Sequence, residues 1–539
     1  MKVTAVLSML HEPAGRPDSA SRRFRGEAPL AWTLFRLRRC KRVGESVVVC
    51  WEDQSATVRP ITDEMKTRFW SPSARKPIFH LDGVSAARRW ADGWRGGLLG
   101  ACEFDRGFYG PAISEILGQT NSDGVLLVDP SAALVDFELI DRLIEHAESR
   151  PELDLCFSQA APGLSGVFLH KRLVEQLAAG GSHPGTLLAY RPDLPMGDPV
   201  ATPSCAPVAT SVARTAHRFT LDSERQIDRI TSATVHLNGE LISTEAEQLV
   251  RLLDAAPSIS ALPREVAMEL TVRRASKPIF SPLASVKIDR PDMTLDIAGA
   301  IFAELSADDD ARIVFGGIGD PLLHPEFAAM VDCAHKAGIG AIAVETDLLE
   351  ITAEGIDRLA DLPLEIISVN LPGISVQTYQ AIMGVDGLAR VMANLARLIQ
   401  RRQAGAKGTP LVAPMFVKTA ANFAEMDAWY DHWLRVLGCA VIGGPTDFAG
   451  QIPDISLAQM EPPRRRACAR INNRLTILSD GRVVFCEQDF LGSQALGTIG
   501  EKSIKDIWTG GMSALHRAHA AGDWQCNALC AACKDWHRS

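Results

Sequence analysis

The stretch Leu475-Thr-Ile-Leu-Ser-Asp-Gly-Arg-Val-Val-Phe-Cys486 places an Asp-Gly pair between two short apolar runs. Asp-Gly in this setting is the strongest short-range signal for a β-hairpin, because its tight turn needs residues that tolerate a positive φ. One cysteine, Cys468, precedes the predicted ribbon, and Cys486 ends it. The hairpin is therefore expected to place two thiols on the flanks of one ribbon.

Three more cysteines follow the hairpin, at Cys526, Cys530 and Cys533, and the last two form a Cys-Ala-Ala-Cys knuckle. Four thiolates gathered in this way suit either a tetrahedral zinc site or a cubane iron–sulfur cluster, and spacing alone does not distinguish the two. The other seven cysteines are scattered and are predicted to be small buried side chains: Cys40, Cys50, Cys102, Cys156, Cys205, Cys333 and Cys439.

Composition narrows the class of protein. The chain has 539 residues, 46% of them hydrophobic and 22% charged, with 56 Lys and Arg against 65 Asp and Glu for a net charge of −9. We expect a globular protein of about three domains that binds neither nucleic acid nor membrane. The apolar run Val3–Leu10 is too short for a signal peptide. We therefore expect a cytoplasmic protein whose clustered cysteines bind metal and form no disulfides.

Residues 1–190 predict an α/β domain. Strands are expected at Val3–Met9, Ser46–Cys50 and Gly124–Val128, with helices at Pro29–Lys41 and Ala133–Glu148. The order strand, loop, helix, strand is typical of a Rossmann-like parallel sheet.

This region resembles the nucleotidyltransferase domain of sugar-nucleotide cytidylyltransferases. The resemblance rests on the loop Ser21-Arg-Arg-Phe-Arg-Gly-Glu-Ala-Pro-Leu30 and on the strand-end Asp129. It implies that the arginine loop cradles phosphates, that Asp129 holds a divalent metal, and that Arg23 and Gly26 belong to the site. Glu27 stands where the family has a lysine, and a carboxylate there would repel phosphate. We expect a retained fold with an inactive site.

A proline-rich stretch at 191–207 reads as a linker, and helical patterns follow at Phe219–Ala233 and Thr244–Ala256. Residues 191–261 are therefore predicted to form a connector.

Strands and helices alternate regularly in residues 262–465. Six such units predict a partial parallel barrel, in which sites lie at the carboxyl ends of the strands. The strands are expected at 266–271, 312–315, 341–346, 365–370, 411–418 and 440–442.

The second of these strands ends in a glycine loop, Phe315-Gly-Gly-Ile-Gly-Asp-Pro-Leu-Leu-His-Pro325. It resembles the loop of radical SAM enzymes that contacts the amino-acid end of S-adenosylmethionine. Glycines allow a ligand close to the backbone, and free amides before a helix favour a carboxylate. The alternative is a tight strand–helix turn that Asp320 caps. The resemblance implies these cofactor-binding residues: Gly316, Gly317, Gly319, Asp320 and Pro321.

Radical SAM enzymes carry three cysteines after the first barrel strand, and these hold the cluster that cleaves the cofactor. Here the flanks of that motif match Glu269–Pro282, but its cysteine positions are Arg274, Pro278 and Ser281. None of these side chains replaces a thiolate. Residues 206–332 contain no cysteine. We therefore expect a degenerate barrel that has lost reductive cleavage of S-adenosylmethionine.

The tail resembles the SPASM extension of radical SAM proteins, which carries auxiliary iron–sulfur clusters. Cysteine, Asp-Gly hairpin, cysteine, Leu-Gly-x-Ile, Ile-Trp and Cys-x-x-Cys follow one another in the family's order. The resemblance implies one [4Fe–4S] cluster, with Cys526 as a spare or alternative ligand, and with these four ligands: Cys468, Cys486, Cys530 and Cys533.

The whole chain thus resembles proteins of the spiro-SPASM kind. The expected fold is α/β: a nucleotidyltransferase-like sheet at 1–190, a connector at 191–261, a partial (β/α)6 TIM-like barrel at 262–465 and a cysteine-rich SPASM domain at 466–539. The expected function is that of an iron–sulfur protein in electron transfer, structural order, or binding of a protein, peptide or small molecule. One alternative is an enzyme that binds S-adenosylmethionine and acts on a peptide or sugar-nucleotide; another is a nucleotidyltransferase.

Overall fold

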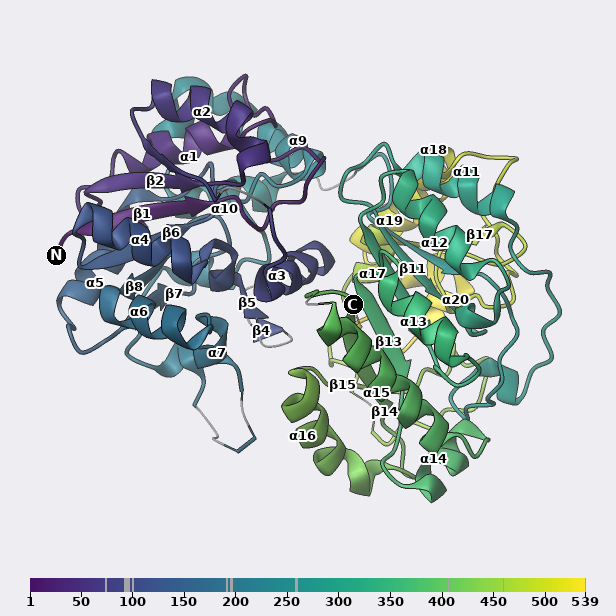
Figure 1. Ribbon diagram of the computed structural model, residues 1–539. Coiled ribbons are helices and arrows are strands. Elements are labelled where there is room, and N and C mark those ends of the chain that lie inside the picture. The colour runs from purple at the N-terminus through teal and green to yellow at the C-terminus, as the bar shows by residue number, and fades with distance from the viewer. Residues whose placement is uncertain are drawn as a thin grey trace. The chain divides into compact units, whose positions relative to one another are not determined.

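The computed structural model describes residues 1–72, 75–91, 97–98, 101–190, 192–193, 197–256, 260–405, 407–458 and 460–538. It divides into two compact units, which we call the first unit, Met1–Ser258, and the second unit, Ile259–Ser539 (Figure 1).

The first unit is built on a seven-stranded mixed sheet in the order β3-β2-β1-β6-β8-β7-β9. β1 pairs in parallel with β2 and β6, whereas β8 runs antiparallel to β6. Every residue of β1 and β6 is buried, as expected for central strands that read as continuous apolar runs. The strands are β1 (Val3–Ser8), β2 (Glu45–Val49), β3 (Arg68–Trp70), β6 (Gly124–Val128), β7 (Leu155–Ser158), β8 (Val167–His170) and β9 (Cys205–Ala206), with a separate pair β4 (Gly97–Leu98) and β5 (Ala101–Cys102).

Ten α-helices and several 3₁₀ turns, η1 to η4, surround this sheet in the described residues. Two predicted helices start late because a side chain caps the N-terminus. α5 begins at Phe137 and not at Ala133, since Asp136 accepts hydrogen bonds from the amides of Glu138 and Leu139. α9 begins at Glu224 and not at Phe219, since Ser223 accepts from the amide of Gln226. The helices are α1 (Pro29–Leu37), α2 (Ser55–Glu64), α3 (Phe79–Trp90), α4 (Gly110–Thr120), α5 (Phe137–Glu148), α6 (Lys171–Gly180), α7 (Gly185–Leu188), α8 (Thr210–Arg214), α9 (Glu224–Ala233) and α10 (Ala246–Ala255); the turns are η1 (Glu52–Gln54), η2 (Glu103–Gly107), η3 (Pro199–Ala201) and η4 (Val235–Ser243).

Helices α9 and α10 pack into the first unit. Ile230 and Leu249 lie in one apolar cluster with Phe24 and Leu134. The described part of the predicted connector up to Ala256 thus contributes to the core of the first unit.

The second unit contains a nine-stranded sheet in the order β15-β14-β13-β12-β11-β10-β16-β17-β18. Its first six strands in the chain are parallel and lie in sequence order, which is the predicted partial barrel. The strands are β10 (Glu265–Glu269), β11 (Arg312–Gly316), β12 (Ala341–Thr346), β13 (Ile366–Asn370), β14 (Leu411–Val417), β15 (Val441–Gly443), β16 (Arg474–Ile477), β17 (Arg482–Val484) and β18 (Gly497–Thr498).

The predicted Asp-Gly hairpin is confirmed as β16 and β17, with Gly481 at φ +84° in the turn. The sequence did not predict where the hairpin lies. β16 pairs in parallel with β10, with Val266 opposite Leu475. The hairpin of the tail therefore continues the barrel sheet.

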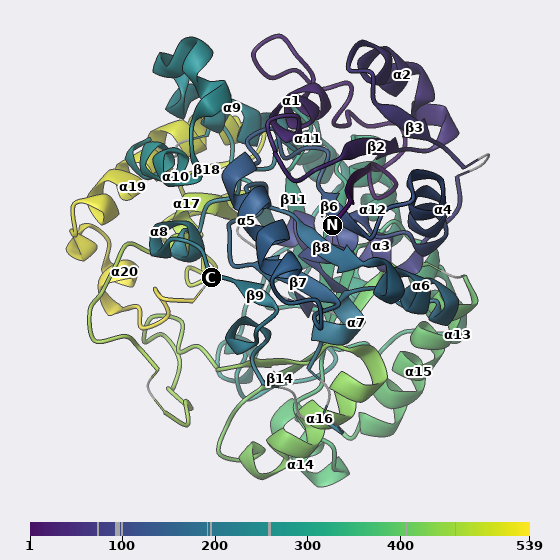
Figure 2. The same cartoon turned by 90° about the vertical axis from the view of Figure 1, so that its left-hand side faces the viewer.

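Helices cover one face of this sheet. Alternate strand residues such as Ile313 and Phe315 are fully buried against them, while Val314 between is half-buried on the other face. Helices α13 and α15 lie side by side in both ribbon views (Figures 1 and 2). The helices are α11 (Leu295–Leu305), α12 (Phe327–Lys336), α13 (Ala353–Asp361), α14 (Val376–Met383), α15 (Leu388–Ala404), α16 (Met426–Leu437), α17 (Ala469–Asn473), α18 (Ile504–Ile507), α19 (Ser513–Ala520) and α20 (Ala528–Ala532), with short turns η5 (Pro282–Ala284), η6 (Pro321–Leu323), η7 (Phe423–Glu425), η8 (Trp508–Met512) and η9 (Trp524–Cys526).

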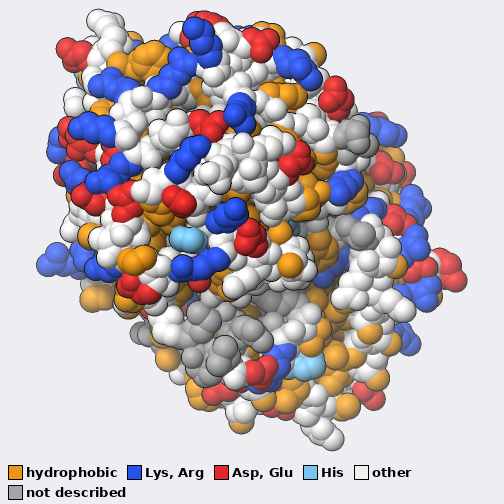
Figure 3. All heavy atoms as spheres, turned by 60° about the vertical axis from the view of Figure 1, so that its left-hand side comes forward, with side chains coloured by type: hydrophobic (Ala, Val, Ile, Leu, Met, Phe, Trp, Pro, Cys, Tyr) orange, Lys and Arg blue, Asp and Glu red, His pale blue; other side chains and the backbone are white. Residues whose placement is uncertain are grey.

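The chain is thus an α/β protein with an N-terminal mixed sheet, a partial barrel sheet and a small C-terminal region, as predicted. Among the helices that the structure describes, none combines the length and the apolar character needed to cross a membrane. On the face in Figure 3, Lys and Arg side chains are interspersed with Asp and Glu.

Candidate functional site

The glycine loop after β11 is packed against the protein's own backbone. A Cβ on Gly319 would collide with the carbonyl oxygen of Thr271, and Gly317 has a φ of +101° and lies against Glu269. A Cβ on Gly316 would lie 2.9 Å from Oε2 of Glu345. Internal packing therefore accounts for Gly317 and Gly319, whereas the flexible Glu345 side chain could move away from a Cβ on Gly316.

Asp320 caps the turn η6, as the alternative interpretation of the loop predicts. Its buried carboxylate accepts hydrogen bonds from the Leu322 amide at 3.0 Å, the Asp347 amide at 3.0 Å and the Thr346 hydroxyl at 2.9 Å. Burial and the neighbouring Asp347 raise the pKa of Asp320 to about 6. Asp320 thus fastens the glycine loop to the end of β12.

Arg274 and Asp347 form a buried ion pair at the same ends of the strands. The guanidinium Nη2 lies 2.5 Å from Oδ1 of Asp347, and Nε donates to Oδ2 at 2.8 Å. Asn370 donates to Oδ1 at 3.0 Å, and the Ser276 hydroxyl donates to Oδ2. Although burial opposes it, Arg274 and these hydrogen bonds lower the pKa of Asp347. The carboxylate is therefore ionised and satisfied within the protein.

The other two positions of the expected cluster motif are also engaged. Pro278 is buried, and its neighbours Lys277 and Ile279 donate backbone hydrogen bonds to Met383 and Ile382. The buried Ser281 caps η5 by accepting from the Leu283 amide.

Arg290 supplies a second buried pair. Its Nε and Nη2 lie 3.0 and 2.7 Å from Oε1 of Glu269 at the end of β10. No sequence pattern indicated this pair, because the 21-residue separation follows no helical or strand period.

The tail cysteines lie in one region of the second unit and form no disulfide. Burial raises the pKa of Cys530 to about 12, and the charges of Cys526, Cys468 and Cys533 add to this rise. The charge of Cys468 likewise raises the pKa of Cys486, so Cys468 is close enough to act on both Cys486 and Cys530. Cys468 and Cys530 are buried, whereas Cys526 is exposed.

Two arginines lie beside these thiols. Arg465 donates to the carbonyl oxygen of Cys530 and lowers the pKa of Cys530 and Cys533 against the larger effect of burial. Arg470 acts in the same direction on Cys486 and pairs with Glu487. Positive charge of this kind favours thiolates. Within the described residues, no three His, Cys, Asp or Glu side chains are grouped closely enough to hold a metal ion.

The predicted phosphate loop of the first unit is tied to the protein. Arg22 pairs with Glu224 at 3.0 Å, and Arg25 donates to the carbonyl oxygens of Thr234 and Asn238. Arg23 folds back onto carbonyl oxygens of its own loop. Gly26 is exposed, with a φ of +90°.

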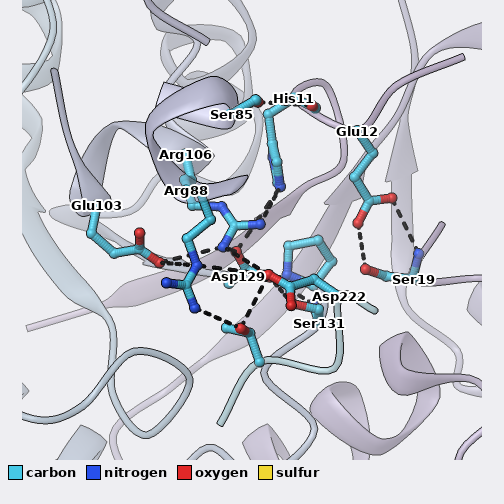
Figure 4. Close-up of polar contacts among 12 residues, drawn as sticks. His11, Glu12, Ser19, Ser85, Arg88, Glu103, Arg106, Asp129, Ser131 and Asp222 are labelled. Atoms are coloured by element: carbon cyan, nitrogen blue, oxygen red, sulfur yellow. Dashed lines mark hydrogen bonds and ion pairs between the residues drawn. The ribbon is translucent and has the colours of Figure 1, made fainter. Parts of the chain in front are cut away.

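Asp129 follows β6, and its carboxylate is paired with arginine (Figure 4). Oδ2 lies 2.9 Å from Nη1 of Arg106, and Oδ1 accepts from the amide and hydroxyl of Ser131. Nη2 of Arg106 also lies 3.1 Å from Nε2 of His11. Because the guanidinium fills the space beside the carboxylate, these residues do not fit the divalent metal that the nucleotidyltransferase resemblance implies.

Two family models match the chain. Residues 280–415 match the Radical SAM superfamily, and residues 468–534 match SPASM, described as an iron-sulfur cluster-binding domain. The chain therefore carries a radical SAM domain followed by a SPASM domain, and these two predictions are confirmed. The radical SAM match begins after Arg274 and Pro278.

Two relatives match the chain at low sequence identity. An uncharacterized protein of Treponema pallidum (strain Nichols) is 22% identical over 306 residues, which cover 54% of this chain and 84% of that protein. The tungsten-containing aldehyde ferredoxin oxidoreductase cofactor-modifying protein of Pyrococcus furiosus is 23% identical over 239 residues, which cover 36% of this chain and 67% of that protein.

Solved structures resemble separate parts of the chain. Streptococcus suis SuiB bound to S-adenosylmethionine has a TM-score of 0.39 at 14% identity, covering 52% of this chain and 73% of SuiB. A cytidylyltransferase from Leptospira borgpetersenii serovar Hardjo-bovis has a TM-score of 0.31 at 12% identity, covering 47% of this chain and 92% of that enzyme. Both TM-scores lie below 0.5 and bear on no functional conclusion.

Proposed function

We propose that this chain is an iron–sulfur protein with a single [4Fe–4S] cluster in its SPASM domain and a barrel that binds a ligand or protein partner without reductive cleavage of S-adenosylmethionine. The observation that carries the proposal is the pairing of Arg274 with Asp347 at the barrel's strand ends. A cluster with an open iron needs three thiolates there. A buried guanidinium in a satisfied ion pair offers none.

The residues around the pair support the same conclusion. The Ser281 hydroxyl accepts a hydrogen bond as a cap, and Pro278 has no ligand atom in its side chain. Gly319 is required by its contact with the backbone of Thr271, and Gly317 by its positive φ beside Glu269, so the presence of these two glycines does not require S-adenosylmethionine. For the nucleotidyltransferase alternative, Arg22 and Asp129 are both held in internal ion pairs, and no observation favours it.

The tail has enough thiols for one iron–sulfur cluster, although in the described structure no three of them are grouped closely enough to hold a metal ion. We assign the ligands to Cys468, Cys486, Cys530 and Cys533, which are buried or half-buried, and leave Cys526 out because it is exposed. Arg465 and Arg470 favour the thiolates, and the Asp535 amide donates to Sγ of Cys533 at 3.3 Å. A bound cluster supplies one-electron transfer. The chain would influence the reduction potential of such a cluster through hydrogen bonds and positive charges near the sulfur atoms.

The test is an assay of iron, acid-labile sulfide and zinc on the full chain purified without oxygen. We expect about four irons and four sulfides per chain and a brown colour. Cys439→Ser, which removes a buried cysteine outside the tail, should leave the iron content unchanged. One zinc per chain with no sulfide would contradict the proposal.

A second assay tests the barrel. The full chain with a chemical reductant and S-adenosylmethionine should form no 5′-deoxyadenosine above the level of the buffer. Steady formation of that product would overturn the assignment of a barrel without reductive cleavage, while leaving the tail cluster to be judged by its iron content.

A further inference from the structure

The first unit contains a cavity of about 330 Å³ at the carboxyl ends of β6 and β7. This volume is near the small end of the range for ligand pockets, roughly 300–1,000 Å³. Much of the wall is apolar, and it includes two aromatic rings, Phe104 and Phe157, whose centroids are 5.1 Å apart. The charged lining residues are Glu103, Arg106, Asp129 and Asp198.

The balance of charge on this wall disfavours anions. Three carboxylates face one arginine among the described lining residues, and Arg106 is already engaged by Asp129 at 2.9 Å. A phosphate or carboxylate ligand would therefore meet net repulsion. Because Arg106 fills the position beside Asp129 where a divalent cation would bind, no metal ion offsets the net negative charge of the cavity wall.

One carboxylate oxygen of Glu103 lacks a hydrogen-bond donor within the described residues. Its Oε1 lies 3.4 Å from Nη1 of Arg106 and 3.9 Å from Nε of Arg88, whereas Oε2 is buried and has no hydrogen-bond partner within the described residues. Figure 4 shows the same asymmetry, with one oxygen of Glu103 joined to both arginines and the other joined to none. A buried carboxylate oxygen without a donor is costly unless a ligand supplies one.

The pKa shifts of the three neighbouring acids, Asp129, Asp222 and Glu103, indicate which of them lacks positive charge. Against the effect of burial, arginines lower the pKa of both Asp129 and Asp222. For Glu103 burial prevails over Arg88 and Arg106, and its pKa is raised. A neutral donor would satisfy the hydrogen bond of Glu103 and leave its charge under-compensated; an ammonium group would satisfy both.

We propose that this cavity is a metal-independent site for a small primary amine with an apolar body, whose ammonium group binds the free oxygen of Glu103. The rings of Phe104 and Phe157 supply the surface for the apolar body, and aromatic faces also attract cations. The hydroxyl of Ser165 is buried in the same wall without a described partner, and its oxygen accepts a further hydrogen bond from the ammonium group. This site is independent of the cluster proposed for the tail.

The test compares matched probes on the full chain by isothermal titration calorimetry. Benzylamine and 2-phenylethylamine are the cations, benzyl alcohol and 2-phenylethanol their uncharged counterparts, and benzoate and phenylacetate the anions. We expect at least one amine to bind about tenfold more tightly than its alcohol, with no binding of either anion and no change on adding magnesium. Glu103→Gln should remove the preference for the amine while retaining the binding of the alcohol.

The matched control is Glu138→Gln on α5, an exposed acid outside the cavity, which should leave every affinity unchanged. Ser165→Ala serves as a second variant should Glu103→Gln not fold, and it should weaken the amine more than the alcohol. Amines that bind no better than the alcohols, or that do not bind at millimolar concentration, would overturn the proposal from the unmodified protein alone.

Discussion

Arg274 and Asp347 are held together by two buried contacts, from Nη2 to Oδ1 at 2.5 Å and from Nε to Oδ2 at 2.8 Å. The pair joins the segment after β10 to the end of β12. In the radical SAM resemblance, Arg274 stands at the first cysteine position. A fixed cation at this point stabilises the strand ends of a barrel that lacks the thiolates for a cluster there.

Arg274→Met should destabilise the second unit strongly, because it leaves the Asp347 carboxylate buried without its counter-charge. Loss of one partner of a buried pair typically costs about 3–5 kcal/mol. Denaturant unfolding followed by circular dichroism would measure the change in midpoint.

The control for that change is Arg397→Met. Arg397 and Asp357 also form a pair with two contacts, at 2.8 and 2.6 Å, but both side chains are substantially exposed to solvent. Solvent screens such a pair, so the unfolding midpoint should hardly move. Equal shifts of the unfolding midpoint in the two variants would show that burial of the Arg274 pair does not increase its contribution to stability.

Gly319→Ala should damage the fold of the glycine loop. The added Cβ would collide with the carbonyl oxygen of Thr271, which is backbone and unable to move aside. Gly299→Ala is the matched control: Gly299 lies within α11 with open space around its Cβ position, so alanine should stabilise by about 0.5–1 kcal/mol. Thermal unfolding of the two variants should therefore shift in opposite directions.

Glu12→Gln should alter the dependence of stability on pH. Burial and Asp18 raise the pKa of Glu12 from 4.5 to about 8, against hydrogen bonds from Ser19. The folded protein thus keeps a proton that the unfolded chain releases, and stability falls as the pH rises from about 4.5 to about 8. Glutamine lacks this loss. Relative to the native protein, the free energy of unfolding of the variant should therefore rise by on the order of a few kcal/mol between pH 4.5 and 8. Above pH 8 the difference between the two proteins should stay constant.

Unfolding midpoints of both proteins at a series of pH values check this prediction. A difference that does not change between pH 4.5 and 8 would contradict the shift assigned to Glu12.

Cys526→Ser and Cys530→Ser should differ in their effect on the tail cluster. Cys530 is buried among the other thiols, whereas Cys526 is exposed. Loss of Cys530 should lower the iron content of anaerobically purified protein and bleach its visible absorbance. Loss of Cys526 should leave both unchanged. Equal loss of iron in both variants would make Cys526 a ligand.

Local patterns predicted much of the fold. The apolar run of β6 and the alternation of strands and helices around β12 located both strands to the residue, and Asp-Gly at the hairpin turn located β16 and β17. The segment between β2 and β6 yielded no helix prediction, although it contains α2, α3 and α4. The glycine loop was recognised, but whether its glycines serve a ligand or the protein's own packing depended on Thr271, more than 40 residues away in the chain.

The sequence by itself showed five cysteines in the tail and none in residues 206–332, and the resemblance to radical SAM enzymes places Arg274, Pro278 and Ser281 at the positions of their cluster cysteines. Only the tertiary structure decided what the charged residues do. Arg274 with Asp347 and Arg106 with Asp129 are separated by 73 and 23 residues, and neither spacing follows a periodic pattern. Such partners are selected by parallel strands that end at one edge of a sheet, where burial makes a counter-charge obligatory.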